Sequence, residues 1–222
     1  MKRESRKSMN IQNKTEILPT VVPDTIDDIL SMQALYAGTG ATIHIDISDG
    51  IFATGGKWNK PEELPEGLKF EVHLMVANPD EDSEAWLARN PVRVIFHHEA
   101  CQHAVSLAEK IIDAKSIPAV AINLETPITD LEDIYPDATN FRLMAIETLG
   151  AQGAKFMPDV YKKISSCKEL FPDAILSIDG GVSEGNAKDL VLCGASKLCV
   201  GSALSRTKDP KAEYKKFLAA VS

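Results

Sequence analysis

Eight short apolar segments recur along this 222-residue chain, and each is followed by a longer segment of helical character. The apolar segments occupy 17–22, 42–48, 70–76, 93–99, 118–123, 141–147, 174–179 and 197–203. Most are too short for helices and rich in Val, Ile, Leu or Phe, which is typical of strands buried on both faces. Strand–helix alternation throughout a chain predicts a parallel sheet with helices outside it. Eight repeats favour an α/β fold of the closed (β/α)8 type, a TIM barrel, over an open doubly wound sheet.

The segments between the predicted strands are amphipathic. Residues 24–38 begin with an Asp suited to cap a helix and end at Gly. In 103–115, Val105, Ala108, Ile111 and Ile112 lie along one side, which predicts the face that packs on the barrel. Further helical segments are expected within 79–90, 159–171, 184–194 and 209–221.

The chain shows no linker or low-complexity segment, so residues 15–222 are predicted to form one barrel domain. Residues 1–14 are polar and basic without an apolar centre, which predicts a mobile tail and no secretory signal. No apolar run approaches the roughly 18 residues of a membrane span. A net charge of −8 gives no basic face for nucleic acid. Four cysteines without a CxxC pair favour free thiols and a cytoplasmic location.

Polar side chains stand near the ends of three predicted strands. His44 and Asp46 lie two residues apart in TIHIDIS and therefore share one face of that strand. His73 lies late in the third strand, and Asp179 ends the seventh. Functional side chains of a parallel barrel gather at the carboxyl ends of its strands, and two imidazoles with two carboxylates suit a divalent transition metal. The same residues also fit a second interpretation, in which each is a hydrogen-bonded polar group of the core.

Several motifs, in the family's order, resemble the ribulose-phosphate 3-epimerase family over nearly all of residues 15–220. HIDISDGIF, EVHLMVANPD and IFHHEA resemble the family's HVDVMDGHF, DVHLMVEPPD and TVHPEA. AINLETPI and SIDGGVSEGNA resemble ALNPATPL and VDGGVN with the following helix start, and LCVGSALSRTKDP resembles the family's final strand. A lone DGG would not be specific, whereas these motifs together are. His97 matches the histidine of the third motif and is assigned no catalytic role.

The resemblance implies a ribulose-phosphate-binding barrel that moves a proton at carbon 3 of a ketopentose 5-phosphate. The family's metal ligands correspond to His44, Asp46, His73 and Asp179, and its acid–base pair to Asp46 and Asp179. One divalent ion, whether Zn, Fe(II), Mn or Co, would stabilise an enediolate as a Lewis acid. Two carboxylates on opposite faces of the sugar would exchange the roles of acid and base.

The phosphate needs a separate binding site, which glycine-rich turns after strands seven and eight supply in such barrels. Without the resemblance, the same DGG and GS segments are explained equally well as tight turns. The expected substrate and phosphate contacts are Met75, Gly150, Gly153, Gly180, Gly181, Gly201 and Ser202.

Three departures from the family bear on the substrate. The family's first strand carries a serine that contacts substrate, whereas PTVVPD here places Val22 or its neighbours there, with Thr20 on the same face at another depth. Ser48 replaces a methionine that lines the family's site. The loop after the sixth strand, residues 147–156, lacks the family's Asn-Pro, gains Glu147 and is one residue longer.

The sequence therefore predicts a metal-dependent epimerase of a phosphorylated ketose, with D-ribulose 5-phosphate to D-xylulose 5-phosphate as the first choice. A hexulose 6-phosphate epimerase is the second, and a non-catalytic barrel that binds metal or sugar phosphate is the third. A decarboxylase or aldolase ranks low because the strand ends carry HxD and no DxK. By analogy with the family, the chain is also expected to form a homo-oligomer. The identity of the metal, and the effect of Val22 and the altered loop on activity, are left open.

Overall fold

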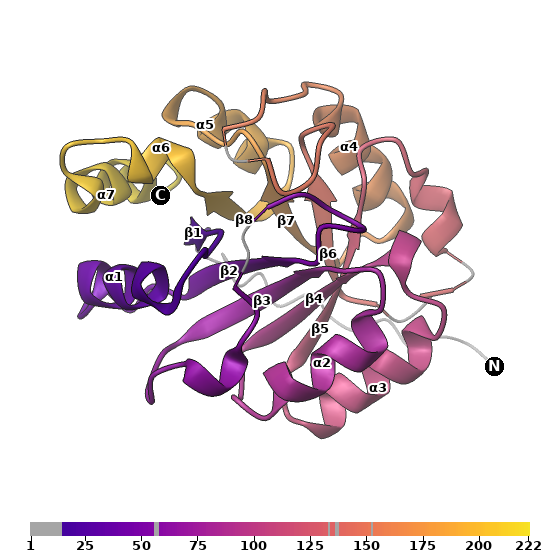
Figure 1. The fold of residues 1–222 in the computed structure, drawn as a ribbon. Helices are drawn as coiled ribbons and strands as arrows, with labels where there is room; N and C mark the ends of the chain where they lie inside the picture. Colours follow the sequence, from indigo (N-terminus) through magenta and orange to yellow (C-terminus); the bar gives the residue numbers. More distant parts are fainter. Residues whose placement is uncertain (1–14, 56–57, 133, 136–137, 152) are drawn as a thin grey trace.

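In the computed structural model, eight parallel strands close into a barrel in the order β1 to β8 within the described part of the chain (Figure 1). The structure describes residues 15–222 except 56–57, 133, 136–137 and 152, so the tail predicted over 1–14 lies outside it. The strands are β1 (Glu16–Val21), β2 (Ile43–Ser48), β3 (Phe70–Met75), β4 (Arg93–His97), β5 (Ile117–Ile122), β6 (Asn140–Met144), β7 (Ile175–Asp179) and β8 (Ala195–Val200). The predicted (β/α)8 barrel is confirmed, and every predicted strand overlaps an observed one.

Helices follow most of the strands and form the outer layer of the barrel (Figure 1). They are α1 (Ile26–Tyr36), α2 (Pro79–Leu87), α3 (Ala104–Asp113), α4 (Val160–Leu170), α5 (Glu184–Leu192), α6 (Ser202–Ser205) and α7 (Pro210–Ala220). Among the described residues, the connections after β2 and β5 hold only the 3-10 turns η1 (Pro61–Glu63) and η3 (Ile128–Leu131). The expectation of eight helical segments is therefore wrong at these two connections, where prolines interrupt the sequence. No helix in the described residues is long and apolar enough to cross a membrane.

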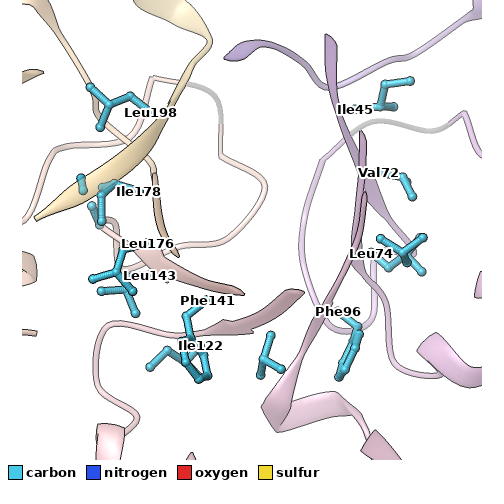
Figure 2. Close-up of a cluster of buried hydrophobic side chains, with 14 of the residues drawn as sticks. Ile45, Val72, Leu74, Phe96, Ile122, Phe141, Leu143, Leu176, Ile178 and Leu198 are labelled. Carbon is cyan, nitrogen blue, oxygen red and sulfur yellow. The ribbon is translucent and has the colours of Figure 1, made fainter. Parts of the chain in front are cut away.

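The main apolar core lies between the strands and the helices. Alternate strand residues point outward into it, and Figure 2 shows these side chains distributed around the barrel. Helix α3 contributes Ala104, Leu107 and Ile111 to this core, whereas Val105 and Ile112 are more than half exposed. The prediction of which face of this helix packs on the barrel is thus wrong except for Ile111. The face through residues 104, 107 and 111 packs against the apolar core instead.

The interior of the barrel is mostly polar. Within the described residues it also holds a small apolar cluster of Ile95, Ala119 and Ala121. At the amino-terminal end of the strands, Glu16 accepts hydrogen bonds from Arg93 at 3.1 Å and from Lys197 at 2.6 Å. Charged side chains therefore continue through the barrel from this end to the ends of β2, β3 and β7, where the predicted site lies.

Candidate active site

Two histidines and two aspartates converge at the carboxyl ends of β2, β3 and β7. Oδ1 of Asp46 lies 2.9 Å from Nε2 of His44 and 2.9 Å from Nδ1 of His73. Oδ2 of Asp179 lies 3.5 Å and 3.4 Å from the same two nitrogens. Both imidazoles are fully buried, and the aspartates are 7% and 8% exposed. The structure thus brings all four predicted ligand residues together.

The spacing of these four atoms fits a divalent ion. Bonds of about 2.0–2.2 Å place neighbouring ligand atoms about 2.8–3.6 Å apart for angles between 90° and the tetrahedral value. The four separations above fall within this range, and all six pairs lie within 4.8 Å. Imidazole and carboxylate donors are also the ligands that Zn, Fe(II), Mn and Co share. The residues present therefore fit a metal.

A carboxylate below the cluster fixes which nitrogen of His44 carries a hydrogen. Nδ1 of His44 lies 2.8 Å from Oε1 of Glu71, and this fully buried carboxylate can only accept. Burial opposes its charge, but Arg142 and His44 hold the pKa of Glu71 well below its ordinary value. Nδ1 therefore donates to Glu71, so Nε2 is the nitrogen of His44 that faces the ligand cluster and can bind a metal once it releases its proton.

A chain of three side chains fixes the tautomer of His73 in the same way. Nδ1 of His97 lies 3.1 Å from the Glu99 carboxylate, and Nε2 of His97 lies 3.0 Å from Nε2 of His73. Burial lowers the pKa of His97 to about 4, so this ring is neutral at neutral pH. His97 then donates through Nδ1 and accepts through Nε2 from His73, which makes Nδ1 of His73 the nitrogen that faces the ligand cluster and can bind a metal without a proton.

Glu99 is suited to begin this chain. Burial opposes its ionisation, but hydrogen bonds from His97, from Thr126 and from the backbone N–H of Asn123 lower the pKa of Glu99 to about 2. The ring of Phe52 lies 4.9 Å from that of His97 and covers it. His97 was assigned no role from the sequence, and the structure places it in direct contact with a predicted metal ligand.

A buried arginine lies against the cluster. The side chain of Arg142, from β6, is 1% exposed. Its Nη2 donates to Glu71 at 2.6 Å, and its Nη1 lies 3.3 Å from Oδ2 of Asp179 and 2.7 Å from Nε2 of His44. The sequence analysis did not single out this residue.

A second set of potential ligands, His44, Glu71 and Cys199, lies deeper in the barrel. The Glu71 carboxylate already pairs with Arg142 and with Arg93, at 2.6 Å and 2.5 Å. Burial raises the pKa of the Cys199 thiol to about 12, so it stays protonated at neutral pH. The upper set of two histidines and two aspartates is therefore the stronger candidate for a metal.

The two aspartates are held in the charged state. Burial acts against this, but hydrogen bonds from His44 and His73, together with Arg142, keep the pKa of Asp179 well below its ordinary value. The charge of His44 lowers the pKa of Asp46 against its burial and against its neighbour Asp179. Two carboxylates this close titrate as a pair, so a proton that enters the pair is shared between them.

A cavity of about 320 Å³ opens above the cluster and gathers the predicted substrate contacts. Asp46 and Asp179 form part of its floor. The other predicted residues in its wall are Met75, Gly150, Gly153, Gly180, Gly181, Gly201 and Ser202. Backbone at Gly180 and Gly181 adopts φ of +103° and +63°, which favours glycine there.

The structure also locates the three departures from the family. Thr20 and Val22 both line the cavity, so a first-strand hydroxyl is present at the depth of Thr20. Ser48 lies against Gly55, where an added Cβ would be 2.8 Å from the Ser48 Oγ. Glu147 is exposed and borders a separate hollow with Thr54 and Asn123. A carboxylate at 147 therefore does not enter the cavity.

The loops after β2 and β6 meet over the site. Thr54 donates to the carbonyl oxygen of Leu149 at 3.0 Å. Gly150 lies so close that an added Cβ would be 1.3 Å from the Thr54 carbonyl oxygen. At the other end of the same loop, Gly153 packs against the guanidinium of Arg206. Glycine at 150 thus allows the two loops to touch.

Comparisons with known proteins identify the family. The model of the ribulose-phosphate 3 epimerase family matches residues 17–205. A ribulose-phosphate 3-epimerase of Bacillus subtilis is 30% identical over 183 residues, which cover 78% of this chain and 84% of that protein. One of Eremothecium gossypii is 27% identical over 186 residues, which cover 76% and 77%.

Solved structures support the fold alone. A variant tryptophan synthase alpha-subunit from Pyrococcus furiosus superposes with a TM-score of 0.68 at 16% identity, over 93% of this chain and 98% of that one. The family match covers most of the chain and all three strand ends that contribute to the cluster. The chain therefore belongs to the ribulose-phosphate 3 epimerase family, and with it to the isomerases that act on carbohydrates.

Proposed function

We propose that the chain is a metal-dependent epimerase that inverts carbon 3 of a phosphorylated ketose, and that it interconverts D-ribulose 5-phosphate and D-xylulose 5-phosphate in the pentose phosphate pathway. One observation carries the proposal. Two histidines and two aspartates place ligand atoms at metal-binding distances on the floor of a cavity whose wall holds the glycine-rich turns after β7 and β8. The relatives named ribulose-phosphate 3-epimerase support the substrate.

We assign His44, Asp46, His73 and Asp179 as the residues that hold one divalent ion. Glu71 and the His97–Glu99 pair orient the two imidazoles so that each presents a lone pair. A bound ion supplies Lewis-acid stabilisation of the negative charge that develops on the substrate oxygens. Its identity among Zn, Fe(II), Mn and Co does not follow from these ligands, because they accept each of the four.

Asp46 and Asp179 are assigned as the acid–base pair. They come from β2 and β7, which lie on different sides of β1 in the barrel. The cluster engages Oδ1 of Asp46 and Oδ2 of Asp179. The second oxygen of each carboxylate is assigned to proton transfer. One aspartate removes the proton of carbon 3 from one face, and the other returns a proton to the opposite face.

The phosphate is assigned to the wall of the cavity formed after β7 and β8. Gly180, Gly181, Gly201 and Ser202 lie there, and backbone N–H groups in such turns bind anions. Loop contacts around Gly150 exclude water from the opposite side of the substrate, which protects a reactive carbanion-like species from side reactions.

A hexulose 6-phosphate is the second candidate substrate. The cavity continues past the cluster to α1, where Ser31, Met32 and Leu35 line it. A ketose with one additional carbon would extend in this direction. A barrel that binds metal or sugar phosphate without turnover is the third candidate, because the serine of the family's first strand is replaced in this chain. Thr20 lines the cavity, with its hydroxyl donating to the carbonyl oxygen of Leu18 at 3.1 Å, so a hydroxyl-bearing residue of the first strand is still present, which argues against this candidate.

The test is turnover after metal loading. The purified full chain, stripped with a chelator and reloaded in turn with Zn, Fe(II), Mn or Co, would be given pentulose 5-phosphates and hexulose 6-phosphates. We expect metal-dependent epimerisation, fastest with ribulose 5-phosphate. Faster turnover of a hexulose 6-phosphate would show that the proposed substrate is wrong and favour the second candidate. Metal binding without turnover of either substrate would favour the non-catalytic barrel.

We also propose that residues 15–222 act as one catalytic domain. Three further statements stay predictions from the sequence: a cytoplasmic location, a homo-oligomeric state, and the absence of nucleic-acid and membrane partners.

A further inference from the structure

Arg142 brings a permanent positive charge to the edge of the ligand cluster. Its Nη1 contacts two of the four proposed ligands, at 2.7 Å from Nε2 of His44 and 3.3 Å from Oδ2 of Asp179. Nη1 is also 3.2 Å from Nδ1 of His44, so it lies near both nitrogens of one ring. The shorter approach is to Nε2, the nitrogen that is proposed to bind the metal, so the guanidinium lies directly beside that nitrogen.

The ion pairs of Arg142 do not explain why it is buried there. Glu71 has a second partner in Arg93, whose Nε and Nη2 both lie 2.5 Å from Oε2. The third partner of Glu71 is His44. Nε of Arg142 itself has no hydrogen-bond partner among the described residues. A buried guanidinium with an unpaired N–H is costly, so its presence beside the cluster points to a role beyond pairing with Glu71.

We propose that Arg142 is a positioning residue that weakens metal binding, so that the ion in this site exchanges readily with solution. The inference rests on the proposed metal site. Two effects act in the same direction. The guanidinium repels a divalent ion held a few ångströms away in a site of low dielectric. It also shares the charge of Glu71 and Asp179, so the carboxylates have less negative charge to offer to His44 and to the ion.

The test is the metal affinity of Arg142→Met, measured by competition with a chelator at pH 8 with Zn²⁺ and with Mn²⁺ on the full chain. We expect affinity to increase by about 10- to 100-fold, the range typical of groups next to metal ligands. Simple structural damage would lower affinity, so the sign of the change separates the two explanations. Arg142→Gln removes the same charge with a polar side chain and serves if the Met variant does not fold.

Two matched variants complete the experiment. Arg142→Lys keeps the charge, and its affinity should stay within a few-fold of the original. Arg93→Met removes an arginine that also pairs with Glu71 but contacts none of the four ligands, and it should change affinity little. Equal or weaker binding by both neutral variants at position 142 would overturn the inference while leaving the metal site intact. Absence of metal binding in every form, the unaltered chain included, would overturn the proposed site and this inference together.

Discussion

The buried neutral ring of His97 should make the metal-free protein lose stability on mild acidification. Burial lowers the pKa of His97 to about 4 from an ordinary value of 6.5, and the hydrogen bond to Glu99 opposes this only in part. Between these two pH values the unfolded chain binds a proton at this position that the folded chain does not. The free energy of unfolding therefore falls as the pH falls from 6.5 to 4.

The size of the effect follows from the interval between the two values. Each pH unit is worth about 1.4 kcal/mol, so an interval of ~2.5 units gives a loss on the order of 3 kcal/mol. His97→Gln removes the titrating group and keeps one donor and one acceptor. Its stability at pH 7 should be lower, but its further loss between pH 6.5 and 4.5 should be smaller than that of the original chain.

The assay is urea unfolding of both proteins across this range in the presence of a chelator. The quantity of interest is the difference between the two curves, since other groups titrate in both. His103→Gln provides the control, because His103 is exposed at the start of α3. The reasoning about His97 is refuted if its variant loses stability on acidification as steeply as the original chain and the control.

Three further substitutions test other parts of the structure. Glu99→Gln should lower metal affinity by about 10- to 100-fold in a chelator competition, because the amide no longer imposes one tautomer on the chain of rings; unchanged affinity would contradict that role. Gly150→Ala should lower kcat/KM by about a hundredfold in a steady-state assay without changing metal affinity, because the added Cβ would force the loop after β6 away from the loop after β2. The control Gly67→Ala, whose added Cβ would meet open space, should leave kcat/KM unchanged. Lys163→Met should lower the free energy of unfolding, measured in urea, by about 1–3 kcal/mol, because Lys163 donates to three carbonyl oxygens of the loop after β5. Lys162 is exposed, so Lys162→Met should leave the free energy of unfolding unchanged.

Much of the fold was readable because strands and helices differ in period and length. The eight apolar runs marked the strands, and strand-end His and Asp residues marked the ligand cluster. The packed face of α3 was not readable, because Val105 and Ile112 are as apolar as the buried Leu107 and Ile111. Only the direction in which the helix leaves β4 decides which of them faces the barrel.

The charged interior was missed for a different reason. Glu71 and Arg142 sit inside strands that otherwise look apolar, and a single charge in such a run is easily dismissed. One signal was available. Glu71 lies two residues before His73, and Arg142 two before Met144, so each shares the inward face of a residue that reaches the site. Tracing that face backward from the strand ends would have found both.

The contacts of His97 and Glu147 needed the structure itself. A histidine at the end of β4 can face solvent, a ligand or another ring, and only the placement of β3 beside β4 brings it within 3.0 Å of His73. From the sequence, Glu147 in the loop after β6 could have faced a bound phosphate or pointed away from it. The structure places Glu147 in another hollow beside the contact between Leu149 and Thr54, and sequence spacing does not reveal a contact between residues 95 positions apart.

The central claim is that Asp46 and Asp179 transfer protons on opposite faces of carbon 3 in a metal-loaded site. The most direct test is epimerisation of ribulose 5-phosphate in deuterated water, followed by NMR from the first turnovers. Two separate carboxylates predict xylulose 5-phosphate that carries solvent deuterium at carbon 3 while the unreacted substrate keeps its hydrogen. In Asp179→Asn no deuterated product should form. Product that retains the substrate's own hydrogen, or no exchange by a folded protein that binds metal, would contradict the account.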